Sequence, residues 1–289
     1  MRLRTLPLAL SCVLMGGALA ALTGSFRWQV MALIALTTVL LQVLSNLAND
    51  LGDGLKGVDN HARVGPQRAI QSGKITVSAM KKGVAICATM AFCSGLLMLW
   101  VSAGALNVIF FSFLGLGLVA ILAAMAYTLG KRPYGYMGLG DAFVLLFFGV
   151  VGVGGSAFLI SGIVDLLWFL PCITIGLLAA GVLNLNNMRD VENDLRHNKM
   201  TLAARLGLAR AKVYHLVILS LAIIGLALFL SLESRPSLGL SLLPGLMLLP
   251  HLSRVFKTNS PALLDPELKK VALTAFLVSL LMFVLSMAL

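Results

Sequence analysis

Charged residues are scarce in this chain of 289 residues, and acids are the scarcest, since Asp and Glu together number only 11. Charged residues make up 11% of the chain and hydrophobic residues 59%. Soluble domains carry about 25% charged residues. A chain this apolar cannot coat a soluble core, so a soluble globular domain is excluded. Intrinsic disorder is excluded as well, because disordered chains are poor in apolar residues.

Cysteine and histidine are also few, with four residues of each. The cysteines all fall in apolar stretches and have no paired spacing, which excludes a disulfide framework and indicates packing residues. The histidines show no spacing typical of a zinc site. Neither residue type therefore points to the function.

Basic residues are in excess, with 22 Lys and Arg and a net charge of +11. Such an excess is typical of proteins that bind nucleic acid. Here, however, long apolar runs separate the basic residues. We therefore expect no nucleic acid partner and relate the excess to the orientation of the chain in a lipid bilayer.

Runs without charged residues have the length of transmembrane helices, which need about 20 apolar residues to cross roughly 30 Å of hydrocarbon. The run Gly83–Gly130 has a break of small residues at 102–107 and is read as two spans. The sequence thus predicts an all-α polytopic membrane protein with nine helices in a single bundle, one domain over residues 1–289. The runs are Thr5–Phe26, Trp28–Asn49, Gly83–Gly130, Ala142–Val164, Leu166–Met188, Val213–Leu232, Pro236–Ser253 and Val271–Leu289. Three prolines in Pro236–Ser253 favour a kinked or partly re-entrant helix there.

The basic residues orient this bundle. With nine spans, every Lys and Arg except Arg27 and Arg235 falls on the side of the amino terminus. By the positive-inside rule that side is cytoplasmic, and the carboxyl terminus lies outside, as expected in a cell (inner) membrane. An alternative is that the first run, which follows Arg2 and Arg4, is a cleavable signal peptide. Its apolar part is longer than the ~7–15 residues typical of such peptides.

Six of the eleven acids gather in two clusters, at residues 46–59 and 186–194, each at the cytoplasmic end of an expected helix. Each cluster has an Asn and an Asp four residues apart, Asn49 with Asp53 and Asn186 with Asp190. Side chains four apart share a helix face, and Asp194 continues the second face. Two such faces form an oxygen-only site, which suits Mg²⁺ together with substrate phosphates. A lone Asp at a helix end is often a capping charge, but two matching clusters favour a site.

Basic residues follow each cluster. They are Arg63, Arg68 and Lys74 after the first, and Arg196, Lys199 and Arg205 after the second. Cations beside a Mg²⁺ site are suited to a diphosphate, because metal and side chains together disperse its charge. For any single one, the alternative is that it only sets topology.

Four stretches carry a family resemblance: residues 2–7, 46–73, 127–141 and 186–207. In these the chain resembles the UbiA-type family of intramembrane prenyltransferases, and most of all the branch that prenylates 1,4-dihydroxy-2-naphthoate in menaquinone synthesis. The first motif of the broader family would need Asp at position 57, where this chain has Gly57, and the third acid is displaced to Asp59.

The resemblance implies a site and a reaction. Mg²⁺ would bind the diphosphate of a polyprenyl donor and be held by Asn49, Asp53, Asp190 and Asp194, with Asp50 and Asn186 nearby. Transfer would be Mg²⁺-dependent and release diphosphate and CO₂, giving demethylmenaquinol. The alternatives are another acceptor, such as 4-hydroxybenzoate or a chlorophyll-type ring, and a secondary transporter. A transporter would place ionisable residues near the midplane of the bilayer, and the spans here have none.

The third stretch supplies further candidates at the cytoplasmic end of the fourth span. We expect Lys131 or Arg132 to hold either the diphosphate or the acceptor carboxylate, and Tyr127 and Lys131 to take part in catalysis. Tyr134, Tyr136 and Asp141 are expected at the acceptor. The alternatives are that the tyrosines are interfacial anchors and that Asp141 only caps a helix.

Overall fold

The computed structural model describes residues 5–58 and 68–289, and within these ranges the chain is helical and has no strand. Eight helical segments are long and apolar enough to cross a membrane. The α-helices are α1 (Leu6–Leu22), α2 (Trp28–Leu55), α3 (Val77–Ala103), α4 (Val108–Ala126), α5 (Gly140–Val144), α6 (Ser156–Ser161), α7 (Phe169–Arg189), α8 (Val191–Arg196), α9 (Leu202–Glu233), α10 (Leu248–Lys257) and α11 (Asp265–Met287). The expectation of an all-helical membrane protein is confirmed. Nine spans remain a prediction, because α1 has 17 residues, fewer than the ~20 a span needs.

The break inside the longest apolar run lies where the small residues predicted it. Helix α3 ends at Ala103, and Gly104 adopts a left-handed conformation (φ 68°) that favours glycine. Asn107 then begins α4, because its side chain accepts a hydrogen bond from the Phe110 N–H (2.9 Å). The run therefore forms two helices.

Several helices are longer than the charge-free runs that predicted them. Helix α2 continues past Asn49 to Leu55, and α9 begins at Leu202 rather than near Val213. A charge-free run marks the part of a helix that lies in hydrocarbon, whereas the helix itself continues into the polar interface. Consequently the first Asp-rich motif is largely helical.

Irregular helical segments occupy two of the expected spans. Residues Gly140–Ser161 form one segment in which a π-helical stretch, Leu145–Gly155, joins α5 to α6. The proline-rich span begins as a 3₁₀ helix, Pro236–Met247, and continues as α10. Pro244 lacks the N–H that an α-helix would use at that position, which explains the irregular geometry.

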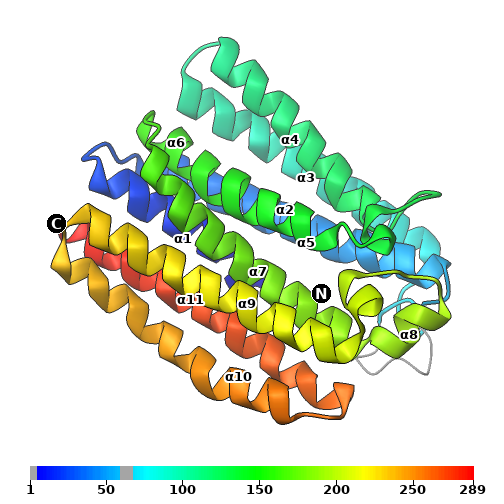
Figure 1. The fold of residues 1–289 in the computed structure, drawn as a ribbon. Coiled ribbons are helices and arrows are strands. Elements are labelled where there is room, and N and C mark those ends of the chain that lie inside the picture. Colours follow the sequence, from blue (N-terminus) through cyan, green and yellow to red (C-terminus); the bar gives the residue numbers. More distant parts are fainter. Residues whose placement is uncertain (1–4, 59–67) are drawn as a thin grey trace.

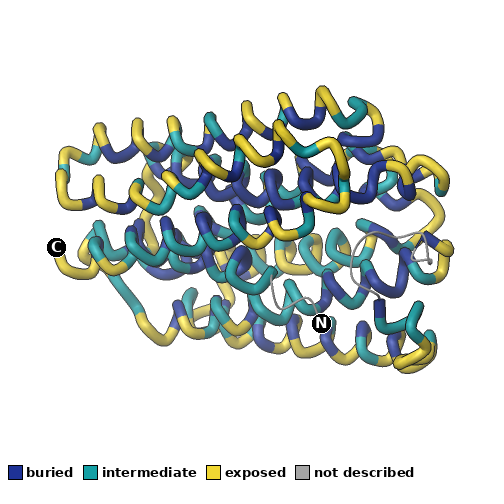
Figure 2. Tube along the Cα trace, turned by 90° about the horizontal axis from the view of Figure 1, so that it is seen from below, coloured by how far each residue is buried: buried dark blue, intermediate teal, exposed yellow. Residues whose placement is uncertain are grey.

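Helix α7 lies at the centre of the bundle and α4 at its margin (Figure 1). Within the most apolar 18-residue stretch of each segment, 61% of the residues are buried in α7 and the turn before it, against 6% in α4. Helix α7 packs against α9, α11 and the Leu145–Gly155 segment, while α4 packs against α2 and α3. Figure 2 shows the buried residues along the inner faces of the helices and the exposed ones on the outer faces. The apolar outer faces are those a lipid bilayer would cover.

The polar segments gather at one end of the bundle. Helix α8 and the carboxyl ends of α2 and α7 lie there, and the carboxyl end of α11 lies at the opposite end (Figure 1). Both acidic clusters are therefore at the same end, on helices that are distant in sequence.

Candidate active site

The first motif occupies the last turns of α2, where a close contact fixes its orientation. Thr128 donates a hydrogen bond from its hydroxyl to the Ala48 carbonyl (3.0 Å) and lies 3.3 Å from Oδ1 of Asn49. Gly52 permits this approach, because a Cβ there would come within 2.5 Å of the Thr128 hydroxyl oxygen. The Asn49 amide is thus held in place beside Asp53.

The second motif spans the junction between α7 and α8. Helix α7 ends at Arg189, and Asp190 (φ −98°, ψ 8°) separates it from α8. The expectation of one uninterrupted helix over 186–194 therefore needs correction, since the helix breaks at Asp190. Backbone hydrogen bonds from Asp190 N–H to Asn186 (3.2 Å) and from Asp194 N–H to Asp190 (2.9 Å) preserve the four-residue spacing.

Both motifs line a single cavity of about 840 Å³. All six candidate metal ligands line it: Asn49, Asp50, Asp53, Asn186, Asp190 and Asp194. The remainder of the lining is largely apolar. It reaches Leu99 on α3 and Leu159 on α6, at the end of the bundle opposite the acids. The cavity thus combines a polar, acidic end with a long apolar chamber.

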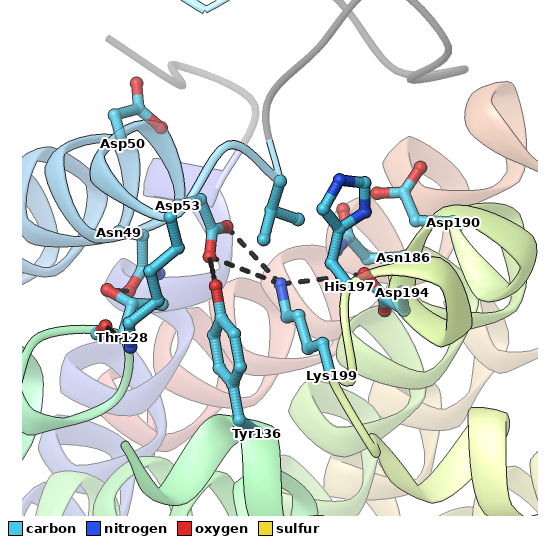
Figure 3. A network of polar contacts seen from close by, with 12 residues as sticks. Asn49, Asp50, Asp53, Thr128, Tyr136, Asn186, Asp190, Asp194, His197 and Lys199 are labelled. Carbon is cyan, nitrogen blue, oxygen red and sulfur yellow. Dashed lines mark hydrogen bonds and ion pairs between the residues drawn. The ribbon is translucent and has the colours of Figure 1, made fainter. Parts of the chain in front are cut away.

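Lys199 connects the two motifs. Its Nζ lies 3.3 Å from Oδ2 of Asp53 and 3.8 Å from Oδ1 of Asp194, and Figure 3 shows it between these two carboxylates. The Tyr136 hydroxyl donates to Oδ1 of Asp53 (2.8 Å). Opposed carboxylates from different helices are therefore brought together around one ammonium group.

Arg189 organises the second motif, a role that the sequence did not reveal. Its guanidinium forms a two-pronged ion pair with Asp190 (2.9 and 2.7 Å) and donates to Oδ1 of Asn186 (2.8 Å). It also pairs with Asp265, at the start of α11. In the sequence, the position of Arg189 next to Asp190 indicates this role, whereas no pattern links Asp265 to the motif.

The candidate diphosphate-binding cations divide by position. Arg68 is buried, forms an ion pair with Asp50 (2.8 Å) and lines the cavity, as do the buried Lys199 and the exposed Lys74. Arg196 is exposed on α8 and does not line the cavity. The candidates Arg63 and Asp59 lie outside the described residues.

Lys131 and Arg132 do not line the cavity that contains the acids. Both are exposed and, with Lys56, Tyr136 and His197, line a second depression of about 590 Å³. Lys56 stacks its ammonium 4.4 Å from the centre of the Tyr136 ring. Tyr136 thus touches both regions, since its hydroxyl reaches Asp53 and its ring lines the basic depression.

Tyr127 and Tyr134 line the cavity, and their rings meet edge to face at 5.3 Å. The Tyr134 hydroxyl donates to the Ala123 carbonyl (3.0 Å). Burial raises the pKa of both phenols, and for Tyr127 the nearby Asp141 raises the pKa further. Both tyrosines are therefore neutral near pH 7. Asp141 itself accepts a hydrogen bond from Tyr214 (3.2 Å) and does not line the cavity.

The donor set fits Mg²⁺ that arrives with a ligand of its own. Carboxylate and amide oxygens are the protein ligands that Mg²⁺ prefers, and it usually keeps waters and binds substrate phosphates. Over residues 5–58 and 68–289, no three His, Cys, Asp or Glu side chains are grouped closely enough to hold a metal ion. Waters or phosphate oxygens would therefore complete the coordination.

Comparison with known proteins agrees with this geometry. Residues 9–280 match the model of the UbiA prenyltransferase family. The chain belongs to the UbiA prenyltransferase family. The resemblance inferred from the sequence is thus confirmed, and with it the class of enzyme.

Two bacterial relatives in the UbiA family are similar over nearly their whole length. The 1,4-dihydroxy-2-naphthoate octaprenyltransferase of Haemophilus influenzae is 43% identical, with 97% of this chain and 92% of the relative covered. The enzyme of the same name from Escherichia coli is 42% identical, with 97% and 91% covered.

Solved structures of UbiA homologues share the fold. An apo homologue from Aeropyrum pernix matches with a TM-score of 0.74 at 16% identity, covering 98% of each chain. A homologue from Archaeoglobus fulgidus bound to DMAPP and Mg²⁺ matches with a TM-score of 0.62 at 18% identity, covering 99% of each chain.

Proposed function

We propose that this protein transfers a polyprenyl group from polyprenyl diphosphate to 1,4-dihydroxy-2-naphthoate, releasing diphosphate and CO₂ and forming demethylmenaquinol. The observation that carries the proposal is the single cavity, whose polar end contains both Asp-rich motifs and whose remainder is apolar. A diphosphate with a prenyl tail has the same two parts. The names and identities of the bacterial relatives support the naphthoate acceptor.

The polar end is suited to hold the diphosphate. Asn49, Asp53, Asn186, Asp190 and Asp194 would hold Mg²⁺, with Asp50 beside them. Arg68, Lys74 and Lys199 line the same end and would contact phosphate oxygens. When bound, Mg²⁺ would neutralise charge that develops on the leaving diphosphate. Cleavage of the allylic C–O bond needs this stabilisation, because the electron pair of the bond leaves with the diphosphate.

The apolar chamber protects the allylic cation that remains. Water would capture such a cation, and an apolar lining excludes it. The ring carbon that carries the carboxylate attacks the cation, so that a new C–C bond forms. The bond to the carboxylate then breaks, CO₂ leaves, and its electron pair restores the aromatic ring. No ring proton has to be removed, which fits neutral Tyr127 and Tyr134 in the cavity.

The acceptor is proposed to enter from the cytoplasmic side. Tyr134 and Tyr136 would contact the ring, and Lys131 or Arg132 would attract its carboxylate from the basic depression. Asp141 would act indirectly, through its charge near Tyr127. In this proposal the amino terminus and the acidic end face the cytoplasm across the cell (inner) membrane, as the basic residues predict.

The proposal is tested by incubating membranes that contain the protein with a polyprenyl diphosphate, labelled 1,4-dihydroxy-2-naphthoate and Mg²⁺. We expect a prenylated product and labelled CO₂ from the carboxyl group, and no product in EDTA. Asp53→Ala and Asp190→Ala should each abolish turnover while the protein remains inserted. Product that forms equally well in EDTA would refute the mechanism, and faster turnover of 4-hydroxybenzoate would identify a different acceptor.

A further inference from the structure

Lys199 lies between the two motifs because the chain turns back immediately after α8. Its backbone N–H donates to the Asp194 carbonyl (2.8 Å), and Asn198 before it adopts φ 54°. Thr201 then begins α9, since its hydroxyl accepts from the Ala204 N–H (3.2 Å). The turn places the Lys199 side chain in the wall of the cavity, where it is only 7% exposed.

The Lys199 ammonium occupies the junction between α2 and α8. Asp53 and Asp194, its two partners, are 6% and 2% exposed. Buried carboxylates that face each other repel, and each loses hydration, unless a cation compensates them. At 3.3 and 3.8 Å from these carboxylates, Lys199 supplies that compensation from within the chain.

Asp53 and Asp194 are also among the residues proposed to hold Mg²⁺, which binds carboxylate oxygens. Metal and ammonium would therefore share these two carboxylates. Two cations that share the same buried carboxylates repel each other. Metal and ammonium therefore compete as long as the two carboxylates are their only shared counter-charges.

We propose that Lys199 is a built-in counter-cation, which holds the junction in the substrate-free protein and makes metal binding depend on diphosphate. This inference rests on the proposed function in taking a diphosphate as the ligand. Diphosphate adds negative charge, so that both cations fit once it is present. The flexible stem of Lys199 then lets the ammonium turn from Asp53 and Asp194 to a phosphate oxygen. Metal and donor thus bind as one complex, and free metal is held weakly.

The test measures Mn²⁺ binding, with Mn²⁺ as the probe for Mg²⁺, on the purified full chain in detergent. Electron paramagnetic resonance reports bound Mn²⁺ with and without inorganic diphosphate, corrected for the complex that the two form in solution. The wild-type protein should bind Mn²⁺ at least about tenfold more tightly when diphosphate is present. Lys199→Met should bind Mn²⁺ alone about tenfold more tightly than wild type does. Lys199→Arg, which keeps the charge, should behave as wild type.

A matched control is Lys82→Met, which removes one exposed lysine on α3 away from the cavity and should leave both affinities unchanged. Equal Mn²⁺ affinity of Lys199→Met and wild type without diphosphate would overturn the proposal. So would a wild-type affinity that diphosphate does not change, a measurement that needs no variant to fold. The product assay is independent: Mn²⁺ binding as expected without any prenyl transfer would overturn the proposed function and leave the role of Lys199 standing.

Discussion

Two buried polar clusters in the described part of the chain differ in what lies beside them. The motif cluster around Asp53, Asp194 and Lys199 lines the cavity. The second cluster, of His215, His251 and Glu267, joins α9, α10 and α11, and none of these three described residues lines the cavity. A polar cluster beside a cavity can exchange its partners for a ligand, whereas one enclosed by helices holds those helices together.

Hydrogen bonding in the second cluster is largely internal. Nδ1 of His251 lies 2.7 Å from Glu267, and Nε2 of His251 lies 2.9 Å from Nε2 of His215. With both rings neutral, His251 donates to Glu267 and accepts from His215, so one arrangement of protons satisfies both contacts. Lys270 also pairs with Glu267. The difference between the clusters predicts that mutations separate activity from stability.

The largest expected effect is a loss of activity at the cavity. Asp53→Asn keeps the size of the side chain but removes a charge from the metal site, and we expect turnover to fall about 100-fold or more. The thermal midpoint should change little, because the Tyr136 and Lys199 side chains retain an oxygen partner. Asp165→Asn, at the opposite end of the bundle, is the control. Turnover of Asp53→Asn within a few-fold of wild type would remove Asp53 from the site.

Asp265 tests how far the motif cluster extends. Its carboxylate forms an ion pair with Arg189, which in turn forms an ion pair with Asp190. In Asp265→Asn the guanidinium of Arg189 is held less firmly. Mutation of residues that orient metal ligands typically lowers metal affinity about 10-fold or more. We expect the Mg²⁺ concentration that gives half-maximal activity to rise. The change in kcat at saturating Mg²⁺ should be smaller. An unchanged Mg²⁺ titration would confine the pair to a structural role.

The sequence could predict the parts of this site that repeat at short range. The four-residue spacing of Asn49 and Asp53 and of Asn186 and Asp190 was sufficient to infer two facing oxygen surfaces. The Arg189–Asp265 pair and the His215–His251 contact depend on how distant helices pack, and no local pattern encodes that packing. For the same reason, only the three-dimensional structure shows that Lys131 does not line the cavity of the acids.

In the enclosed cluster we expect a loss of stability without a loss of chemistry. His251→Leu removes the partner of both His215 and Glu267, and an unsatisfied buried polar group costs about 1–3 kcal/mol. Thermal unfolding in detergent should show a lower midpoint, while the specific activity of the folded fraction stays near wild type. A large fall in kcat of folded His251→Leu would show that the two clusters are coupled.

The smallest effect concerns Tyr127, a titratable group on the cavity side of the comparison. Burial, and then Asp141 and Asp53, raise its pKa above the ordinary value of 10.0, so the neutral phenol persists to higher pH than usual. Because loss of CO₂ replaces the removal of a ring proton, the proposed reaction needs no catalytic base at this step. Tyr127→Phe should therefore lower kcat only modestly and leave the shape of the pH profile of kcat between about 7 and 10 unchanged. A limb of the wild-type profile in this range that disappears in Tyr127→Phe would show that the phenol ionises during turnover. The cavity-lining tyrosine would then be an acid–base group rather than a neutral part of the wall.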